Sequence, residues 1–212
     1  MRDITEVTRI SKTEQTPDRS RLFEIASEQG GYFTAEQATT CGYSRALLSH
    51  HVKSGTFIRI RRGLYRFREY PSSSREDVLA AWMAVGKDSS MVSHESALDI
   101  LGLSDIIPDV VHLTVSRSRR NFPSLPGVKI HTTTKPSQKE DIITRDGIII
   151  TSVKRSILDA AEAGTAPEQI EMAVIQAVDR GLVTPQSLQK EADKRGRRVS
   201  KLIANSLYKV KQ

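Results

Sequence analysis

The stretch TAEQATTCGYSRALLSHHVKSGTFIRIRRGLYRF, residues 34–67, contains two short helix patterns followed by a hairpin pattern. Thr34 and Gln37 have the spacing of a capping box at a helix start. Ser44 is a preferred N-cap for the next helix, which is expected to end near Gly55. Only a three-residue turn with a central glycine separates the two helices, and this arrangement is typical of a helix-turn-helix.

A β-hairpin is predicted directly after these helices. Residues 57–60 and 64–67 have strand character, and Arg61-Arg62-Gly63 between them is a short turn that contains glycine. A further helix is predicted upstream, with a cap at Asp18 or Ser20. Three helices and a basic hairpin in this order indicate a winged helix over residues 18–70, in which the third helix enters the major groove of DNA and the hairpin lies along the backbone.

The charge of this segment favours the same function. Residues 41–68 contain seven Lys or Arg and no Asp or Glu. Clustered positive charge favours a polyanionic partner, although a solvated basic surface is the alternative. Cations hold phosphates, and short polar side chains on a groove helix contact base edges. The predicted DNA-binding residues lie on one face of the third helix and on the hairpin: Ser44, Arg45, Ser49, His50, Lys53, Arg59, Arg61, Arg62 and Arg66.

A second domain of mixed α and β structure is predicted over residues 71–212, after a linker at 71–74. Its strands are expected toward its front and its helices toward its end, so the fold class of the whole chain is α+β. Capping boxes are predicted for two of its helices, Ser73 with Glu76 and Thr165 with Glu168. The predicted helices are 73–85, 93–102, 152–163, 167–180 and two that open at Thr184 and Ser200, and the predicted strands are 110–115, 128–132 and 147–151.

Three other segments have an expected character. Residues 1–17 are predicted to be a disordered leader. A basic loop with Arg117, Arg119 and Arg120 follows a strand and is a candidate for accessory contacts with DNA or a partner. Residues 190–212 carry eight Lys or Arg against two acidic residues, so the helical tail is predicted to be basic.

Composition excludes several classes of protein. No apolar run approaches the roughly 20 residues that a membrane-spanning helix needs. Cys41 is the only cysteine, so an internal disulfide and a cysteine cluster for zinc are both excluded, and a reducing cytoplasm is expected. Gly-rich phosphate loops are missing as well, and no cofactor is expected.

Enzymatic signatures are weak. Ser93, His94 and Asp99 include the residue types of a nucleophilic triad, but no Gly-x-Ser-x-Gly turn presents the serine. His94-Glu95 lacks the second histidine of a zinc protease motif, and the neighbours His50 and His51 point about 100° apart on a helix. No Asp or Glu has a Lys two positions later, as a metal-dependent nuclease of the restriction type would require. We therefore expect no enzyme and no metal.

The sequence resembles the AbiEi-type antitoxins of bacterial abortive-infection toxin-antitoxin systems. In the first domain the resemblance rests on Gly31–Thr34, Tyr43-Ser44-Arg45 and the segment from Gly55 to Tyr65. In the second it rests on Ser93–Leu98, Val111–Val115 and the segment from Asp146 to Asp159. Each motif is weak alone, and their order and spacing carry the resemblance.

The resemblance implies a DNA-binding antitoxin that represses its own operon. Its partners would be inverted repeats in its own promoter and a cognate nucleotidyltransferase-like toxin, which it counteracts directly or indirectly. The family assigns no catalytic residue to this region. Two alternatives remain: a winged-helix regulator whose second domain senses a ligand or protein without any toxin, and a DNA-processing enzyme.

Overall fold

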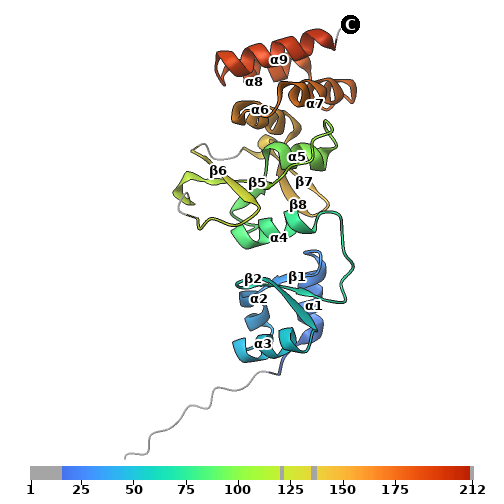
Figure 1. Cartoon of the computed structure of the whole chain (residues 1–212), viewed down its shortest axis with the longest axis vertical. Helices are drawn as coiled ribbons and strands as arrows, with labels where there is room; N and C mark the ends of the chain where they lie inside the picture. The colour runs from blue at the N-terminus through green and yellow to red at the C-terminus, as the bar shows by residue number, and fades with distance from the viewer. Residues whose placement is uncertain (1–15, 120–121, 135–137, 211–212) are drawn as a thin grey trace, which may run out of the picture. The chain divides into compact units, whose positions relative to one another are not determined.

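The chain divides into two compact units, Met1–Pro71 and Ser72–Gln212, which are described separately (Figure 1). The structure is a computed structural model that describes residues 16–119, 122–134 and 138–210. Of the predicted leader, only Thr16 and Pro17 fall within the described residues.

Unit 1 is a winged helix, as predicted. Its three helices pack with a small antiparallel sheet that has the strand order β1-β3-β2, and β1 lies between α1 and α2 in the sequence (Figure 1). The hairpin β2-β3 forms the wing. The elements are α1 (Arg19–Ser27), β1 (Tyr32–Thr34), α2 (Ala35–Thr40), α3 (Arg45–Lys53), β2 (Phe57–Arg61) and β3 (Leu64–Phe67).

The predicted helix starts of unit 1 are confirmed. The Arg21 backbone N–H donates to the Asp18 carboxylate at 2.9 Å. At α2, the Thr34 backbone N–H donates to the Gln37 side chain at 2.8 Å, and the Gln37 backbone N–H donates to the Thr34 hydroxyl at 3.2 Å. These bonds satisfy backbone donors that have no partner inside the helix.

Strand β1 was not predicted from the sequence. It has three residues, which is too short for a strand periodicity, and it leads directly into the cap of α2. It pairs with β3, where Phe33 lies opposite Tyr65. Its pairing turns the two-stranded wing into a three-stranded sheet, which is needed because an isolated hairpin is only marginally stable.

Aromatic side chains fill the core of unit 1. The Phe33, Phe57 and Phe67 rings contact one another with centroids 4.9–5.2 Å apart, and Leu22 and Leu48 pack against this group from the helices. Gly31 is required beside it, because a Cβ there would lie 2.4 Å from the Tyr70 ring. Its φ of +86° also disfavours any other residue.

Unit 2 contains a five-stranded sheet with the order β6-β5-β4-β8-β7. Strands β5 and β6 are parallel, as are β4 and β8, and the other neighbours are antiparallel. Helices α6 to α9 follow the last strand and form the helical end (Figure 1). The elements are α4 (Glu76–Val85), β4 (Ser90–Val92), α5 (His94–Leu101), β5 (Val111–Ser116), η1 (Arg117–Arg119), β6 (Val128–Thr133), η2 (Lys139–Asp141), β7 (Ile142–Arg145), β8 (Ile148–Thr151), α6 (Val153–Ala163), α7 (Pro167–Asp179), α8 (Pro185–Asp193) and α9 (Arg197–Lys209).

Three predicted helix starts of unit 2 need correction. Helix α4 begins at Glu76 after Arg75, and only half of the expected box forms, with the Ser73 backbone N–H donating to Glu76 at 3.3 Å. Thr165 does not cap α7, because its hydroxyl donates to Glu95 at 2.7 Å. Ser200 lies inside α9, where its hydroxyl donates to Asp193 at 2.6 Å.

Strands β4 and β7 were also missed. Strand β4 has only three residues, yet it is the central strand, between β5 and β8. It ends one residue before α5, with β5 beside it and β6 next to β5, so several polar residues of these elements lie near one another. Among the described residues, no helix is long and apolar enough to cross a bilayer.

Candidate DNA-binding face and histidine-lined pocket

Helix α3 presents a polar face. Its Leu48 is 1% exposed and packs in the core, which directs the opposite face of the helix outward. That face carries the exposed residues predicted to contact DNA, together with Ala46: Ser44, Arg45, Ser49, His50 and Lys53. The Ser44 hydroxyl accepts from the Leu47 backbone N–H at 3.2 Å, so Ser44 also serves as the N-cap.

His51 belongs to the core side of α3, although its neighbour His50 is exposed. The His51 ring lies 4.9 Å from the Phe57 ring and 5.6 Å from the Tyr43 ring. Burial lowers the pKa of His51 below its ordinary value, and the adjacent His50 adds to the shift. His51 is thus a packing residue, and the two histidines do not form a common site.

The wing carries arginines near its tip. Arg59 and Arg62 are exposed and Arg61 is half-buried. The strand pairing is irregular between Arg59 and Arg61, and Gly63 takes a φ of +79° in the turn. A bulge at this position re-aims the side chains beside it. The tip therefore combines several positive charges with a locally twisted backbone.

Arg66 is not available to DNA, contrary to the prediction. It is 5% exposed, and its guanidinium donates to the backbone carbonyls of Tyr70 and Pro71, both at 2.9 Å. The guanidinium carbon also lies 5.7 Å from the centre of the Tyr32 ring. Arg66 thus ties the last residues of unit 1 to its sheet. An arginine on the hairpin predicted a phosphate contact. The guanidinium instead binds backbone carbonyls of residues outside the hairpin.

The other two basic segments, the loop after β5 and the C-terminal tail, differ in how many of their basic side chains are paired with acids. Arg117 and Arg119 are exposed in η1, and Arg119 donates to the Ser89 hydroxyl; Arg120 lies outside the described residues. Several bases of the C-terminal tail form ion pairs with acids of unit 2. Arg195 lies 2.7 Å from Asp159, and Lys209 lies 2.8 Å from Glu171. Part of the tail's positive charge is therefore neutralised within the unit.

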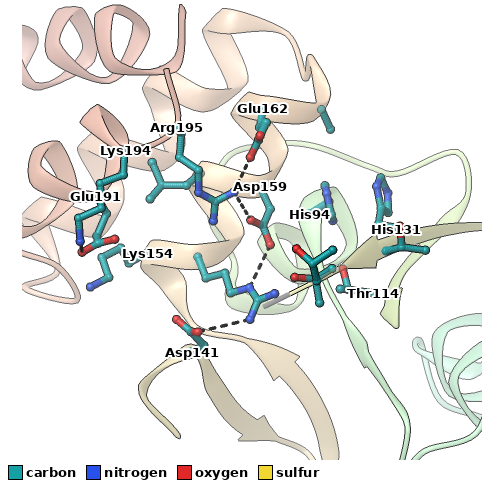
Figure 2. Close-up of a pocket in the computed structure, with 16 residues that line it drawn as sticks. His94, Thr114, His131, Asp141, Lys154, Asp159, Glu162, Glu191, Lys194 and Arg195 are labelled. Atoms are coloured by element: carbon teal, nitrogen blue, oxygen red, sulfur yellow. Dashed lines mark hydrogen bonds and ion pairs between the residues drawn. The ribbon is translucent and has the colours of Figure 1, made fainter. Parts of the chain in front are cut away.

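Unit 2 contains a pocket of about 590 Å³ between the sheet and the helical end. One side is lined by charged residues that form a chain of ion pairs, in which Arg155 contacts Asp141 and Asp159, and Asp159 also contacts Arg195 (Figure 2). The lining holds four acidic and four basic residues. Since these charges balance and several are paired, the pocket is not an anion-binding site on charge alone.

The other side of the pocket is lined by His94, Thr114 and His131 (Figure 2). His94 and His131 belong to a cluster with His112, in which one ring nitrogen from each residue lies within 4.8 Å of the others. The His131 Nε2 and His112 Nδ1 atoms are 3.2 Å apart. The His94 and His131 rings are stacked, with centroids separated by 3.5 Å.

Two sets of polar contacts hold the cluster from behind. The His94 Nδ1 atom lies 2.8 Å from the Ser93 hydroxyl, which accepts from the Thr114 hydroxyl at 2.7 Å. On the other side, a Glu95 carboxylate oxygen lies 3.8 Å from the His112 Nε2 atom, and the second oxygen accepts from Thr165. The rings of His94 and His112 are therefore positioned by polar neighbours.

The cluster is neutral at physiological pH. Burial lowers the pKa of His94 to about 2 and that of His131 to about 4, and the neighbouring histidines add to both shifts. Burial also lowers the pKa of His112, although Glu95 opposes this shift. Neutral imidazoles keep a free lone pair, which is the form that binds metal ions.

No metal-binding role was predicted for His94, His112 or His131. The three residues lie on three elements, and no short motif joins them. The strand pattern contains the relevant information. His112 and Thr114 lie two residues apart on β5, and the parallel register places His131 of β6 opposite Thr114. Residues two apart on a strand point to the same face, so this register brings His112 and His131 together.

The fold and the exposed face of α3 define unit 1 as a winged helix of the kind found in transcriptional regulators. Residues 20–68 match a family model described as "Transcriptional regulator, AbiEi antitoxin". The resemblance stated from the sequence is confirmed for this segment. The match does not extend into unit 2.

A solved structure has a similar fold over most of the chain. The crystal structure of RV2827C protein from Mycobacterium tuberculosis superposes with a TM-score of 0.58 and 17% identity, and the alignment covers 88% of this chain and 76% of that chain. At this identity the similarity concerns the fold alone. No curated protein matches the sequence significantly.

Proposed function

We propose that the protein is a DNA-binding antitoxin that represses its own operon and counteracts a cognate nucleotidyltransferase-like toxin in the bacterial cytoplasm. The match of residues 20–68 to the AbiEi antitoxin regulators carries this proposal. The exposed polar face of α3 and the arginines of the wing support it, because a groove helix and a basic hairpin are what a winged helix uses on DNA.

The proposed DNA contacts divide into two kinds. Ser49 and His50 on α3 would contact base edges, while Arg45, Lys53 and the wing arginines Arg59, Arg61 and Arg62 would contact phosphates. Arg66 is left out because it is buried. Arg117, Arg119 and Arg120 remain accessory candidates for contacts with DNA or a partner.

Two measurements on the whole chain test the proposal. Fluorescence anisotropy should give tighter binding to the protein's own promoter than to a shuffled duplex of equal length and composition. Co-expression with a nucleotidyltransferase encoded beside it should restore growth of the host. Equal affinity for both duplexes would contradict the repressor, and failure to restore growth would contradict the antitoxin.

The pocket favours a second candidate function. A volume of about 590 Å³ lies in the range of small-molecule sites, so unit 2 could instead sense a ligand and control a regulator that has no toxin. Growth rescue separates the two, since a ligand sensor would give none. We further propose that the protein is not an enzyme; cleavage of plasmid DNA by the pure protein with Mg²⁺ or Mn²⁺ would contradict this.

A further inference from the structure

We infer that His94, His112 and His131 bind one divalent transition-metal ion such as zinc(II). The site lies in unit 2 and is separate from the proposed DNA-binding face. Three elements supply the ligands: His94 starts α5, His112 lies on β5 and His131 lies on β6. A bound ion would therefore connect the start of a helix to two parallel strands.

The distances support a common ion. Two imidazole nitrogens on one tetrahedral zinc lie about 3.4 Å apart, since each Zn–N bond is about 2.0–2.1 Å. The 3.2 Å between His131 Nε2 and His112 Nδ1 already has this length. The third nitrogen is within 4.8 Å of the others, so a rotation of the ring that moves it by up to about 1.4 Å completes the set.

The neighbours of the cluster match those of known metal sites. A metal-bound imidazole usually donates its other N–H to a carboxylate or another oxygen, which orients the ring. Glu95 occupies this position behind His112 Nε2, at 3.8 Å, and Thr165 holds Glu95 in place. Ser93 occupies the equivalent position behind His94 Nδ1, and Thr114 holds Ser93.

The ligand set also indicates which metals fit. Three neutral imidazoles suit Zn²⁺, Cu²⁺ and Ni²⁺ and give little affinity for Mg²⁺ or Ca²⁺, which prefer oxygen ligands. Because His94 and His131 line the pocket, the remaining coordination position would be open to it. Such an open position is available to water or to a small ligand with a donor atom.

The test uses the full-length protein without a histidine tag. After treatment with a chelator and dialysis, it is titrated with Zn²⁺ against a chromophoric competitor, and separately with Co²⁺ while the visible absorption spectrum is recorded. We expect one equivalent of Zn²⁺ and visible Co²⁺ bands of a four- or five-coordinate site, whereas Mg²⁺ should not compete.

Variants locate the site. The chain has five histidines, and the double variant His50→Ala/His51→Ala removes the two outside the cluster. This control should bind like the wild type, while His131→Ala should weaken Zn²⁺ binding on the order of 100-fold. Glu95→Gln, which keeps the shape of the side chain, should weaken it about 10–100-fold. Circular dichroism checks that each variant is folded.

Three results would overturn the inference. They are a wild-type protein that takes up no stoichiometric Zn²⁺, a control variant that loses the metal, and a folded His131→Ala variant that retains full affinity. If His131→Ala does not fold, the wild-type stoichiometry and Glu95→Gln still decide, since a metal held elsewhere would not respond to Glu95. None of these measurements depends on DNA or on a toxin.

Discussion

The backbone of His94 has a φ of 53°, in the left-handed region that residues other than glycine rarely adopt. Ser93 precedes it as the N-cap of α5, but the Ser93 hydroxyl makes no capping hydrogen bond to the helix backbone. It bonds instead to His94 and Thr114. A position that looks like an ordinary cap in the sequence therefore serves the histidine cluster, at a cost in backbone strain of about 1–3 kcal/mol.

The stability of the metal-free protein should fall as the pH drops below 6.5. The unfolded chain takes up protons on its histidines near pH 6.5, whereas folded His131 does so only near 4 and folded His94 near 2. Protons thus favour unfolding throughout pH 6.5 to 4, by at most about 1.4 kcal/mol per pH unit for each histidine.

Urea denaturation at pH 7, 6 and 5 measures this effect through the fluorescence of Trp82, the only tryptophan, which is buried in unit 2. His131→Ala should reduce the dependence on pH, because it removes a histidine whose pKa is lowered in the folded protein. A midpoint that stays constant from pH 7 to 5 would mean that the cluster is solvated.

At the scale of the element, the wing is proposed to contact phosphates. The double substitution Arg61→Ala/Arg62→Ala should weaken binding to all DNA sequences alike. It should lower the magnitude of the slope of log affinity against log salt by about 1–2, because fewer counterions are released on binding when fewer phosphates are contacted. Binding titrations at four salt concentrations measure the slope.

A control for the wing removes a charge elsewhere in unit 1. Arg21 is exposed on α1, outside the proposed interface, and Arg21→Ala should leave the slope near that of the wild type. If the wing variant also keeps the wild-type slope, the wing does not take part in the interface.

Helix α3 is proposed to read the bases. Substituting Ser49 or His50 with Ala should cost about 1–3 kcal/mol at the preferred site and little on random DNA, because contacts with base edges carry the sequence preference. Both side chains are exposed, so the fold should be unaffected. Competition assays with the two duplexes measure the difference, and equal losses on both would show that α3 does not discriminate between sequences.

At the scale of the whole molecule, each unit has its own hydrophobic core. The aromatic core of unit 1 is built from residues before 71, and the core of unit 2 is built from residues after 77. Separate cores are what independently folding domains have. We therefore propose that the units divide the work, with DNA binding in the first and antitoxin activity in the second.

This division predicts the behaviour of the separated halves. Residues 72–212 should fold and restore growth in the presence of the toxin, but lose specific binding to the promoter. Weak nonspecific binding to DNA is compatible with the division, because the tail is basic, although Arg195 and Lys209 are paired with acids. Co-expression of each half with the toxin tests this. Rescue by residues 1–71 alone would show that the assignment is wrong.

The winged helix could be predicted from the sequence because its signals are local. The box of Thr34 with Gln37, the Ser44 cap and the arginine turn with Gly63 each act within a few residues, and their order leaves few folds that accommodate them. The same reasoning found the longer strands and helices of unit 2. It missed β1, β4 and β7, which have three or four residues and are strands mainly because neighbouring strands pair with them.

Only the tertiary structure decided how the polar side chains are used. Arg66 became a buried donor because Tyr70 and Pro71 place their carbonyls beside it. Thr165 turned from a helix cap into a partner of Glu95, 70 residues away. His94, His112 and His131 meet because the register of β5 with β6 and the start of α5 bring them together. Such contacts depend on sheet register, which local periodicity does not specify when partners are distant in sequence.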